Sequence, residues 1–212
     1  PSDGDDIDSW DSQEGNDYRF EQTTVSQKPH YVADSINSLP GINFNNGHYL
    51  DHAAQIFSST EGTVFIITKS SGFGPGDTIL SHGSTPTNGE SLRIMTSNSF
   101  PIKSSVESRV SFSSDRVDGD TTLSNNTAYI LTIGSDGSDY HIRVNGNDET
   151  ETVSTGSNSG DWFGDNSSID ITTIGALQRV SVSDRYIGDI CEIIIYDSYL
   201  SSEEIDSVEA YL

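Results

Sequence analysis

Short apolar runs separated by clusters of Gly, Asn, Asp and Ser recur along most of this 212-residue chain. This pattern is typical of many strands joined by turns. Thr63–Lys69 is a continuous apolar run bounded by Gly on both sides, which predicts a strand buried on both faces in the middle of a sheet. Further strands are predicted at Thr78–Ser81, Ser91–Thr96, Glu107–Phe112, Ala128–Ile133, Tyr140–Val144, Ile169–Ile174 and Tyr186–Tyr196.

Turn residues between these runs predict two hairpins. Asn46-Gly47 is a favoured two-residue turn, so we expect Leu39–Phe44 to pair with His48–Leu50. The Gly-rich and Ser-rich segment after Ile133 predicts a second hairpin, which joins that strand to the one beginning at Tyr140. The sequence therefore indicates antiparallel sheets.

The C-terminal end predicts a single short helix. Ser201 is followed three residues later by Glu204, which is the spacing of a capping box. Ile205, Val208 and Leu212 then fall on one helical face, so we expect an amphipathic helix that packs on the edge of the sandwich.

The chain divides into two parts of different composition. Residues 1–17 are acidic and have only Ile7 and Trp10 as anchors, which predicts an arm or loop of weak order unless something packs on it. Residues 18–212 are predicted to form a single β-sandwich domain, because all-β domains of this length are common.

Several segments resemble one known family. Gly188–Asp197 and the following Leu200–Leu212 are similar to the terminal signature of bacterial and phage laminin G-like domains in the concanavalin A-like lectin/glucanase superfamily. Segments within Lys28–Leu50, Glu61–Phe65 and Ile174–Ala176 resemble the same family, in the same order. The resemblance implies an all-β, two-sheet antiparallel jelly-roll sandwich with one short C-terminal helix.

The same resemblance draws attention to the N-terminal region. Family members usually carry a further strand with an apolar-Trp pattern before the segment that corresponds to Ser9-Trp10-Asp11, and that strand is absent here. The acidic arm, upstream sequence or a neighbouring subunit would then take its place. An open sheet edge of this kind invites completion by another chain.

The charge balance limits the classes of partner. The chain has 33 Asp and Glu against 10 Lys and Arg, a formal net charge of -23. Such a surface repels phosphate backbones, so nucleic acid and anionic membranes are not expected partners. No segment is long and apolar enough for membrane insertion, and no signal peptide is recognised. The Asp and Glu residues are dispersed along the chain, so we interpret their excess as a means of solubility in salty water and not as a means of acquiring divalent cations.

Catalytic and zinc motifs find little support. The string Glu204, Asp206 and Glu209 matches the spacing of glucanase carboxylates, but on a helix these side chains diverge instead of meeting in a cleft. His48 and His52 lack a third ligand at a zinc-like spacing. We therefore expect that the chain is not an enzyme.

One loop offers oxygen ligands for a cation. Asp115, Asp118 and Asp120 lie in a turn-rich segment, and hard carboxylate oxygens are what Ca²⁺ requires, so Ca²⁺ is a candidate cofactor. The alternative, which the spacing favours, is that these Asp side chains stabilise turns through local backbone amides.

The long polar segment 154–168 has the composition of a sugar-binding loop. Trp162 and Phe163 offer aromatic faces for a pyranose, while amides and carboxylates nearby suit its hydroxyl groups. The alternative is that one or both rings fold back and close the end of the sandwich. The predicted ligand-binding residues are Trp162, Phe163, Asp161, Asp165, Asn158, Asn166 and Tyr140.

Two functions remain open, and both are extracellular. The first is a non-catalytic, lectin-like module that binds a glycan on a bacterial surface or phage particle. The second is a structural virion component, for example in capsid decoration, a tail or a fibre, that contacts a neighbouring protein subunit within a larger assembly. A glycoside hydrolase is the third and least supported alternative.

Overall fold

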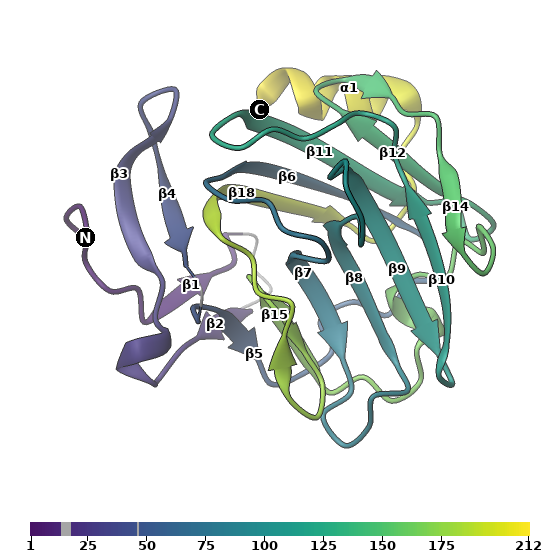
Figure 1. The fold of residues 1–212 in the computed structure, drawn as a ribbon, viewed down its shortest axis with the longest axis horizontal. Coiled ribbons are helices and arrows are strands. Elements are labelled where there is room, and N and C mark those ends of the chain that lie inside the picture. The colour runs from purple at the N-terminus through teal and green to yellow at the C-terminus, as the bar shows by residue number, and fades with distance from the viewer. Residues whose placement is uncertain (14–17, 46) are drawn as a thin grey trace.

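The computed structural model describes residues 1–13, 18–45 and 47–212, and two antiparallel sheets packed face to face dominate it (Figure 1). Within these residues one sheet has nine strands, in the order β1 (Ser9–Asp11), β2 (Arg19–Glu21), β5 (Leu50–His52), β15 (Ile171–Ile174), β7 (Thr78–Gly83), β8 (Ser91–Thr96), β9 (Ser104–Val110), β10 (Ser113–Asp118) and β14 (Thr152–Thr155). The predicted jelly-roll sandwich is confirmed.

The second sheet has seven strands in the described part of the chain. Their order is β13 (Asn147–Asp148), β12 (Tyr140–Val144), β11 (Ala128–Ser135), β6 (Gly62–Ser70), β18 (Gly188–Tyr196), β4 (Leu39–Phe44) and β3 (His30–Ile36). The remaining elements are a small hairpin of β16 (Leu177–Gln178) and β17 (Val182–Ser183), two 3-10 turns (Val25–Gln27 and Phe163–Asp165) and the helix α1 (Ser202–Tyr211).

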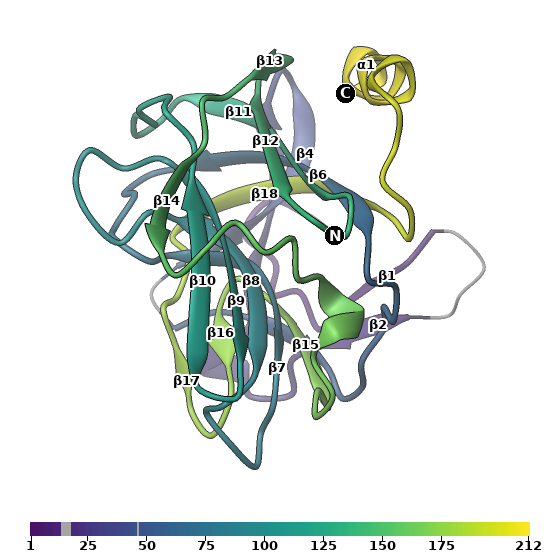
Figure 2. The same ribbon diagram turned by 90° about the vertical axis from the view of Figure 1, so that its right-hand side faces the viewer.

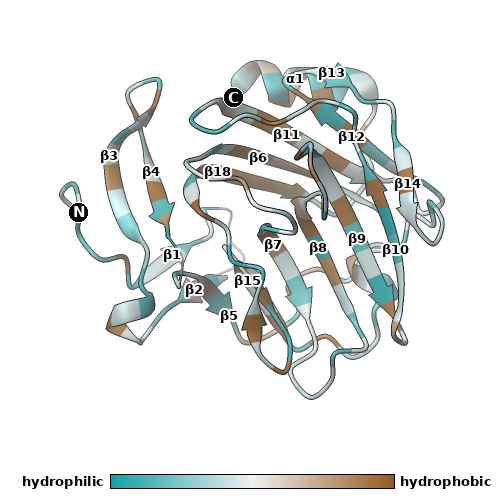
Figure 3. Ribbon diagram, in the orientation of Figure 1, coloured by the Kyte–Doolittle hydropathy of each residue, from teal (hydrophilic) through white to brown (hydrophobic). Residues whose placement is uncertain are grey.

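The core lies between the two sheets. Strand alternation sends Leu92 and Ile94 of β8 to the same side as Val106 of β9, and all three are fully buried. Val64 and Ile66 of β6 meet them from the other sheet. β6 lies between β11 and β18 and is buried along nearly its whole length, so the predicted central strand is confirmed. Figure 3 shows apolar segments along β6, β8 and β18.

The helix α1 begins with the predicted capping box. The backbone N–H of Glu204 donates to the Ser201 side chain, and the Glu204 carboxylate accepts from the Ser201 backbone. Ile205 packs with Phe65 of β6, whose side chain points away from the main core. The helix therefore covers the outer face of the seven-stranded sheet (Figure 2). The sequence had predicted that it packs on the edge of the sandwich, and this placement is wrong. No helix in the described residues is long and apolar enough to cross a membrane.

One predicted hairpin is wrong. Leu39–Phe44 pairs with β3 and β18 in one sheet, whereas Leu50–His52 belongs to the other sheet. The chain therefore crosses between the sheets at this point instead of turning back, and Asn46 of the predicted turn lies outside the described residues. The turn that does form is Asn37-Ser38, between β3 and β4, where φ is 52° and 63°.

Two further segments differ in detail from the prediction. The strand expected at Glu107–Phe112 ends at Val110, because Ser111 and Phe112 adopt positive φ and turn the chain into β10. In the acidic N-terminal segment, β1 pairs with β2, and Asp6 bridges to His30. Residues 14–17 of the predicted arm lie outside the described residues.

Candidate functional site

The two rings of the predicted sugar-binding loop lie inside the protein. Trp162 and Phe163 are 1% and 0% exposed. The Trp162 indole lies on Gly62, where a Cβ would collide with it, and Phe163 packs against Phe57 and His82 with ring centroids 5.4 and 4.4 Å apart. Neither ring presents a face to a ligand. Burying two large apolar rings is favoured because it removes their surface from water.

Two polar side chains of this loop, Asn158 and Asp165, make local hydrogen bonds. The Asn158 side chain accepts from the Tyr140 backbone N–H at 2.7 Å, and the Asp165 carboxylate accepts from the Trp162 backbone N–H at 2.7 Å. Tyr140 is buried and donates its hydroxyl to the Asp161 carbonyl. Burial raises the pKa of the Asp161 carboxyl. Asn166 is also buried. These contacts fix the loop against β12 and do not assemble an open sugar site.

The three predicted calcium ligands do not converge. Asp115 and Asp118 are three residues apart on β10, so their side chains leave opposite faces of the strand. The Asp115 carboxylate accepts from the Ser157 backbone N–H at 2.7 Å, and the Asp118 carboxylate accepts from the Ser105 hydroxyl at 2.6 Å. Asp120 lies in the next turn. Among the described residues, no group of three or more His, Cys, Asp or Glu could hold a metal ion.

The carboxylates of the glucanase spacing diverge only in part. Glu204 caps the helix, whereas Asp206 and Glu209 both pair with Arg143 of β12, at 2.9 and 3.2 Å. The expected divergence therefore holds for Glu204, but Asp206 and Glu209 converge on one guanidinium group, which neutralises part of their charge.

A row of charged side chains crosses the outer face of the nine-stranded sheet. Arg93 lies between inward-pointing Leu92 and Ile94, so it points away from the core. Strand register places Glu107 of β9 directly opposite Arg93 and also opposite Arg116 of β10. The two Glu107 oxygens bind these two guanidinium groups at 3.1 and 3.4 Å.

Two more arginines join this row. Arg109 lies two residues after Glu107 on β9, and therefore on the same face. Arg179 comes from the β16–β17 hairpin, which lies directly on β7, because at Gly83 a Cβ would collide with the Gln178 carbonyl. We call Arg93, Arg109, Arg116 and Arg179 the arginine cluster.

The arginine cluster holds an excess of positive charge. Four of the seven arginines of a chain with net charge -23 gather here. Asp184 and Glu107 pair with Arg93, and Glu107 and Asp118 pair with Arg116. In the described part of the chain, however, no carboxylate lies within 4.0 Å of a side-chain nitrogen of Arg109 or Arg179. Partial burial, together with the charges of Arg109 and Arg93, lowers the pKa of Arg179. An anion would relieve this repulsion.

An exposed aromatic ring lies beside the cluster. Phe112, at the β9–β10 turn, is 67% exposed, and its ring packs over Gly89. The neighbouring Asn88 carbonyl accepts from the Arg179 guanidinium at 3.4 Å. Guanidinium donors and an apolar ring thus occur at the same end of the sheet.

The sequence analysis missed this site. Arg93, Glu107 and Arg109 all fall within predicted strands, and charged residues at alternate positions of otherwise apolar strands were the available signal. What could not be seen was the register that brings residues from three strands and a distant hairpin together.

The fold is similar to those of several solved structures, although the sequence matches no known protein family and no curated protein. The CBM40 of a Ruminococcus gnavus IT-sialidase, bound to α2,3-sialyllactose, has a TM-score of 0.67 and 17% identity and covers 80% of this chain and 96% of its own. Domain 4 of a GH43 extracellular arabinanase from Geobacillus stearothermophilus, in complex with arabinotriose, has a TM-score of 0.64, 14% identity and coverages of 89% and 82%.

A third similar structure is the NanB sialidase from Streptococcus pneumoniae, with a TM-score of 0.64 and 20% identity. The match covers 78% of this chain but only 26% of the sialidase. At identities this low, the similarities establish the β-sandwich fold alone.

Proposed function

We propose that this chain is a non-catalytic carbohydrate-binding module whose ligand carries an acidic sugar, held by the arginine cluster. The observation that carries the proposal is that, among the described residues of a strongly acidic protein, Arg109 and Arg179 have no carboxylate partner. A carboxylate accepts from guanidinium groups in charge-assisted hydrogen bonds, which are among the strongest in proteins. The similar fold of a module bound to α2,3-sialyllactose supports this choice of ligand.

The remaining residues of the site have distinct tasks. Glu107 holds Arg93 and Arg116 in place, so the two central guanidinium groups are fixed before the ligand arrives. Arg109 and Arg179 bind the carboxylate, and the exposed Phe112 ring packs against the apolar side of the sugar. The rest of the acidic surface repels an anionic glycan, so binding is confined to this face.

We also propose where the protein acts. The similar arabinanase is named as extracellular, and glycans with acidic sugars occur on cell surfaces, which favours a role outside the cell. Assignment to the laminin G-like family, and display on a bacterial surface or phage particle, belong to the same proposal. Glu204 caps α1 while Asp206 and Glu209 are both held by Arg143, so the three carboxylates of the glucanase spacing do not meet, which supports a role without catalysis.

Isothermal titration calorimetry with α2,3-sialyllactose and with lactose tests the function. We expect binding of the first and none of the second. Arg109→Ala should weaken binding by about 10- to 100-fold, because a hydrogen bond to a charged group contributes roughly 1.5–3 kcal/mol. Arg19→Ala, which removes an exposed arginine of β2 outside the cluster, serves as the matched control.

Two results would contradict the proposal. Equal binding of both sugars would remove the role of the carboxylate, and equal losses in Arg109→Ala and Arg19→Ala would remove the role of the cluster. A structural role that contacts other subunits is the second candidate function. It is favoured by one observation: β18 pairs with β6 along its length but with β4 only over Gly188–Ile190, which leaves part of one sheet edge open among the described residues.

A further inference from the structure

The seven-stranded sheet has an open edge along the C-terminal half of β18. This strand pairs with β6 over Gly188–Tyr196, but with β4 only over Gly188–Ile190. Within the described residues, no strand pairs with the other side of Glu192–Tyr196. Burial changes at the same point, since Gly188–Ile190 is buried and Cys191–Ile195 is only half-buried.

Local structure explains why β4 leaves β18 here. The register of β18 shifts between Ile190 and Glu192, which leaves Cys191 as a β-bulge. On the other strand, Pro40 has no N–H to donate to a ladder. Among the described residues, the backbone groups on this side of Glu192–Tyr196 therefore have no strand partner, and such edges pair readily with an added strand.

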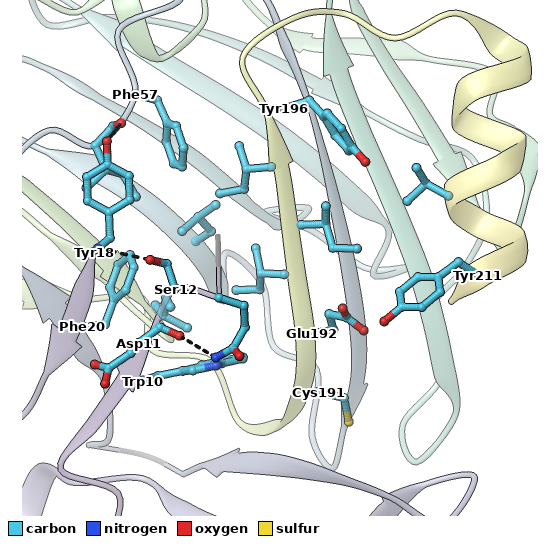
Figure 4. Close-up of a pocket in the computed structure, with 18 of the residues that line it drawn as sticks. Trp10, Asp11, Ser12, Tyr18, Phe20, Phe57, Cys191, Glu192, Tyr196 and Tyr211 are labelled. Carbon is cyan, nitrogen blue, oxygen red and sulfur yellow. Dashed lines mark hydrogen bonds between the residues drawn. The ribbon is translucent and has the colours of Figure 1, made fainter. Parts of the chain in front are cut away.

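A groove of about 830 Å³ runs along this open edge (Figure 4). On one side, Ile193 and Ile195 of β18 point toward the main core without being covered. On the other side lie Trp10, Tyr18 and Phe57, which also pack only partly against the core. Among the residues that the structure describes, no side chain fills the sandwich where a further strand would place its inward side chains.

The charges of the groove indicate the chemistry of its occupant. Two acidic residues, Asp11 and Glu192, line it, and no Lys or Arg is among the described residues that do so. The chain as a whole carries a net charge of -23, which disfavours a second copy as the partner. The groove is therefore complementary to an apolar segment that carries positive charge.

We propose that the open edge of β18 binds an extended peptide strand of a partner protein, apolar at alternate positions and carrying Lys or Arg between them. The strand pairs antiparallel to Glu192–Tyr196, in line with β4, and its apolar side chains fill the groove. Backbone pairing supplies affinity and the apolar positions supply specificity. This site goes beyond the proposed sugar binding, because none of the arginines of the arginine cluster is among the residues that line the groove.

Fluorescence anisotropy with a synthetic peptide of roughly seven residues, alternating Val and Lys, tests the site. A control peptide has Pro in place of the central Val, which keeps the charge and breaks the ladder. We expect saturable binding of the first peptide and at least about 10-fold weaker binding of the second. Amide hydrogen exchange should slow at alternate residues of Glu192–Tyr196 when the first peptide binds.

Protein variants separate the groove from general charge attraction. Glu192→Lys and Trp10→Ala should each weaken binding of the Val/Lys peptide by about 10-fold, since one reverses a lining charge and the other removes apolar contact. Glu203→Lys makes the same charge change on the exposed surface of α1, outside the groove, and should leave affinity nearly unchanged.

Three outcomes would overturn the assignment. The first is that the Val/Lys peptide does not bind at concentrations up to about 1 mM, a range that includes weak peptide complexes. The second is that both peptides bind equally well. The third is that Glu192→Lys and Glu203→Lys change the affinity equally. Displacement of the peptide by α2,3-sialyllactose would instead identify the groove as the sugar site. Failure of the arginine cluster to bind sugar has no bearing on these results, because no peptide measurement involves Arg109 or Arg179.

Discussion

His82, a buried histidine on β7, makes the stability of the fold depend on pH. Its ring is 0% exposed, stacks on Phe57 with centroids 5.8 Å apart and meets Phe163 edge-on. Neither ring nitrogen has a hydrogen-bond partner among the described residues. Burial lowers the pKa of His82 from 6.5 to about 3, because nothing in this apolar setting compensates a positive charge.

The sign and size of the effect follow from linkage. Below the unfolded pKa of 6.5 the unfolded chain binds a proton at His82 and the native protein does not, so stability falls as pH decreases toward about 3. Each pH unit in this window costs about 1.4 kcal/mol. Between pH 7 and pH 5 the loss from this one residue is therefore about 2 kcal/mol.

Urea denaturation followed by tryptophan fluorescence, at about pH 7 and pH 5, measures this loss. In His82→Leu the proton-linked loss is absent, so the free energy of unfolding relative to wild type should rise by about 2 kcal/mol from pH 7 to pH 5. Phe57→Leu is the control, because it removes ring packing and leaves the histidine. Its cost should be the same at both pH values. An equal difference between His82→Leu and wild type at both pH values would refute the reasoning.

Three further predictions concern packing and charge. Gly62→Ala should lower the free energy of unfolding by about 1–3 kcal/mol in the same urea assay, because the added Cβ collides with the Trp162 indole. Gly83→Ala should displace the β16–β17 hairpin and weaken sialyllactose binding by about 10-fold in calorimetry, with unchanged affinity for the Val/Lys peptide. Burial raises the pKa of Asp77 to about 6, so stability decreases as pH rises from 3.8 through 6. Asp77→Asn should then raise the free energy of unfolding at pH 7 by about 1 kcal/mol, after allowance for solvent screening, and should leave it unchanged at pH 4, as measured in the same urea assay.

The elements that the sequence predicted well are those specified by neighbouring residues. The apolar run of β6 needs no partner information to indicate a buried strand, and the Ser201–Glu204 capping box is complete within four residues. The failed hairpin at Asn46-Gly47 shows the limit. A favoured turn dipeptide specifies a local bend, but the partner of Leu39–Phe44 is chosen by the whole sheet, and β18 and β3 pair with it instead.

The candidate site was less predictable for the same reason. Trp162 and Phe163 looked like a sugar platform because their neighbours are polar, yet only the folded loop decides whether a ring meets water or Gly62. The arginine cluster posed the opposite problem, because its members are spread over three strands and a hairpin. No local pattern connects Arg93 with Arg179.

The row Arg93–Glu107–Arg116 is itself informative about function. A buried ion pair such as Arg93–Glu107 gains little net stability, because loss of hydration offsets the attraction, and apolar residues of similar volume often serve as well. What the row does provide is a fixed position for charge on the outer face of the nine-stranded sheet. The alternation that sends Leu92 and Ile94 into the core sends Arg93 outward, so a rigid core orients the binding groups directly. The same alternation orients Arg109, two residues after Glu107 on β9, so this proposed ligand of the sugar carboxylate should lose little conformational entropy when an anion binds.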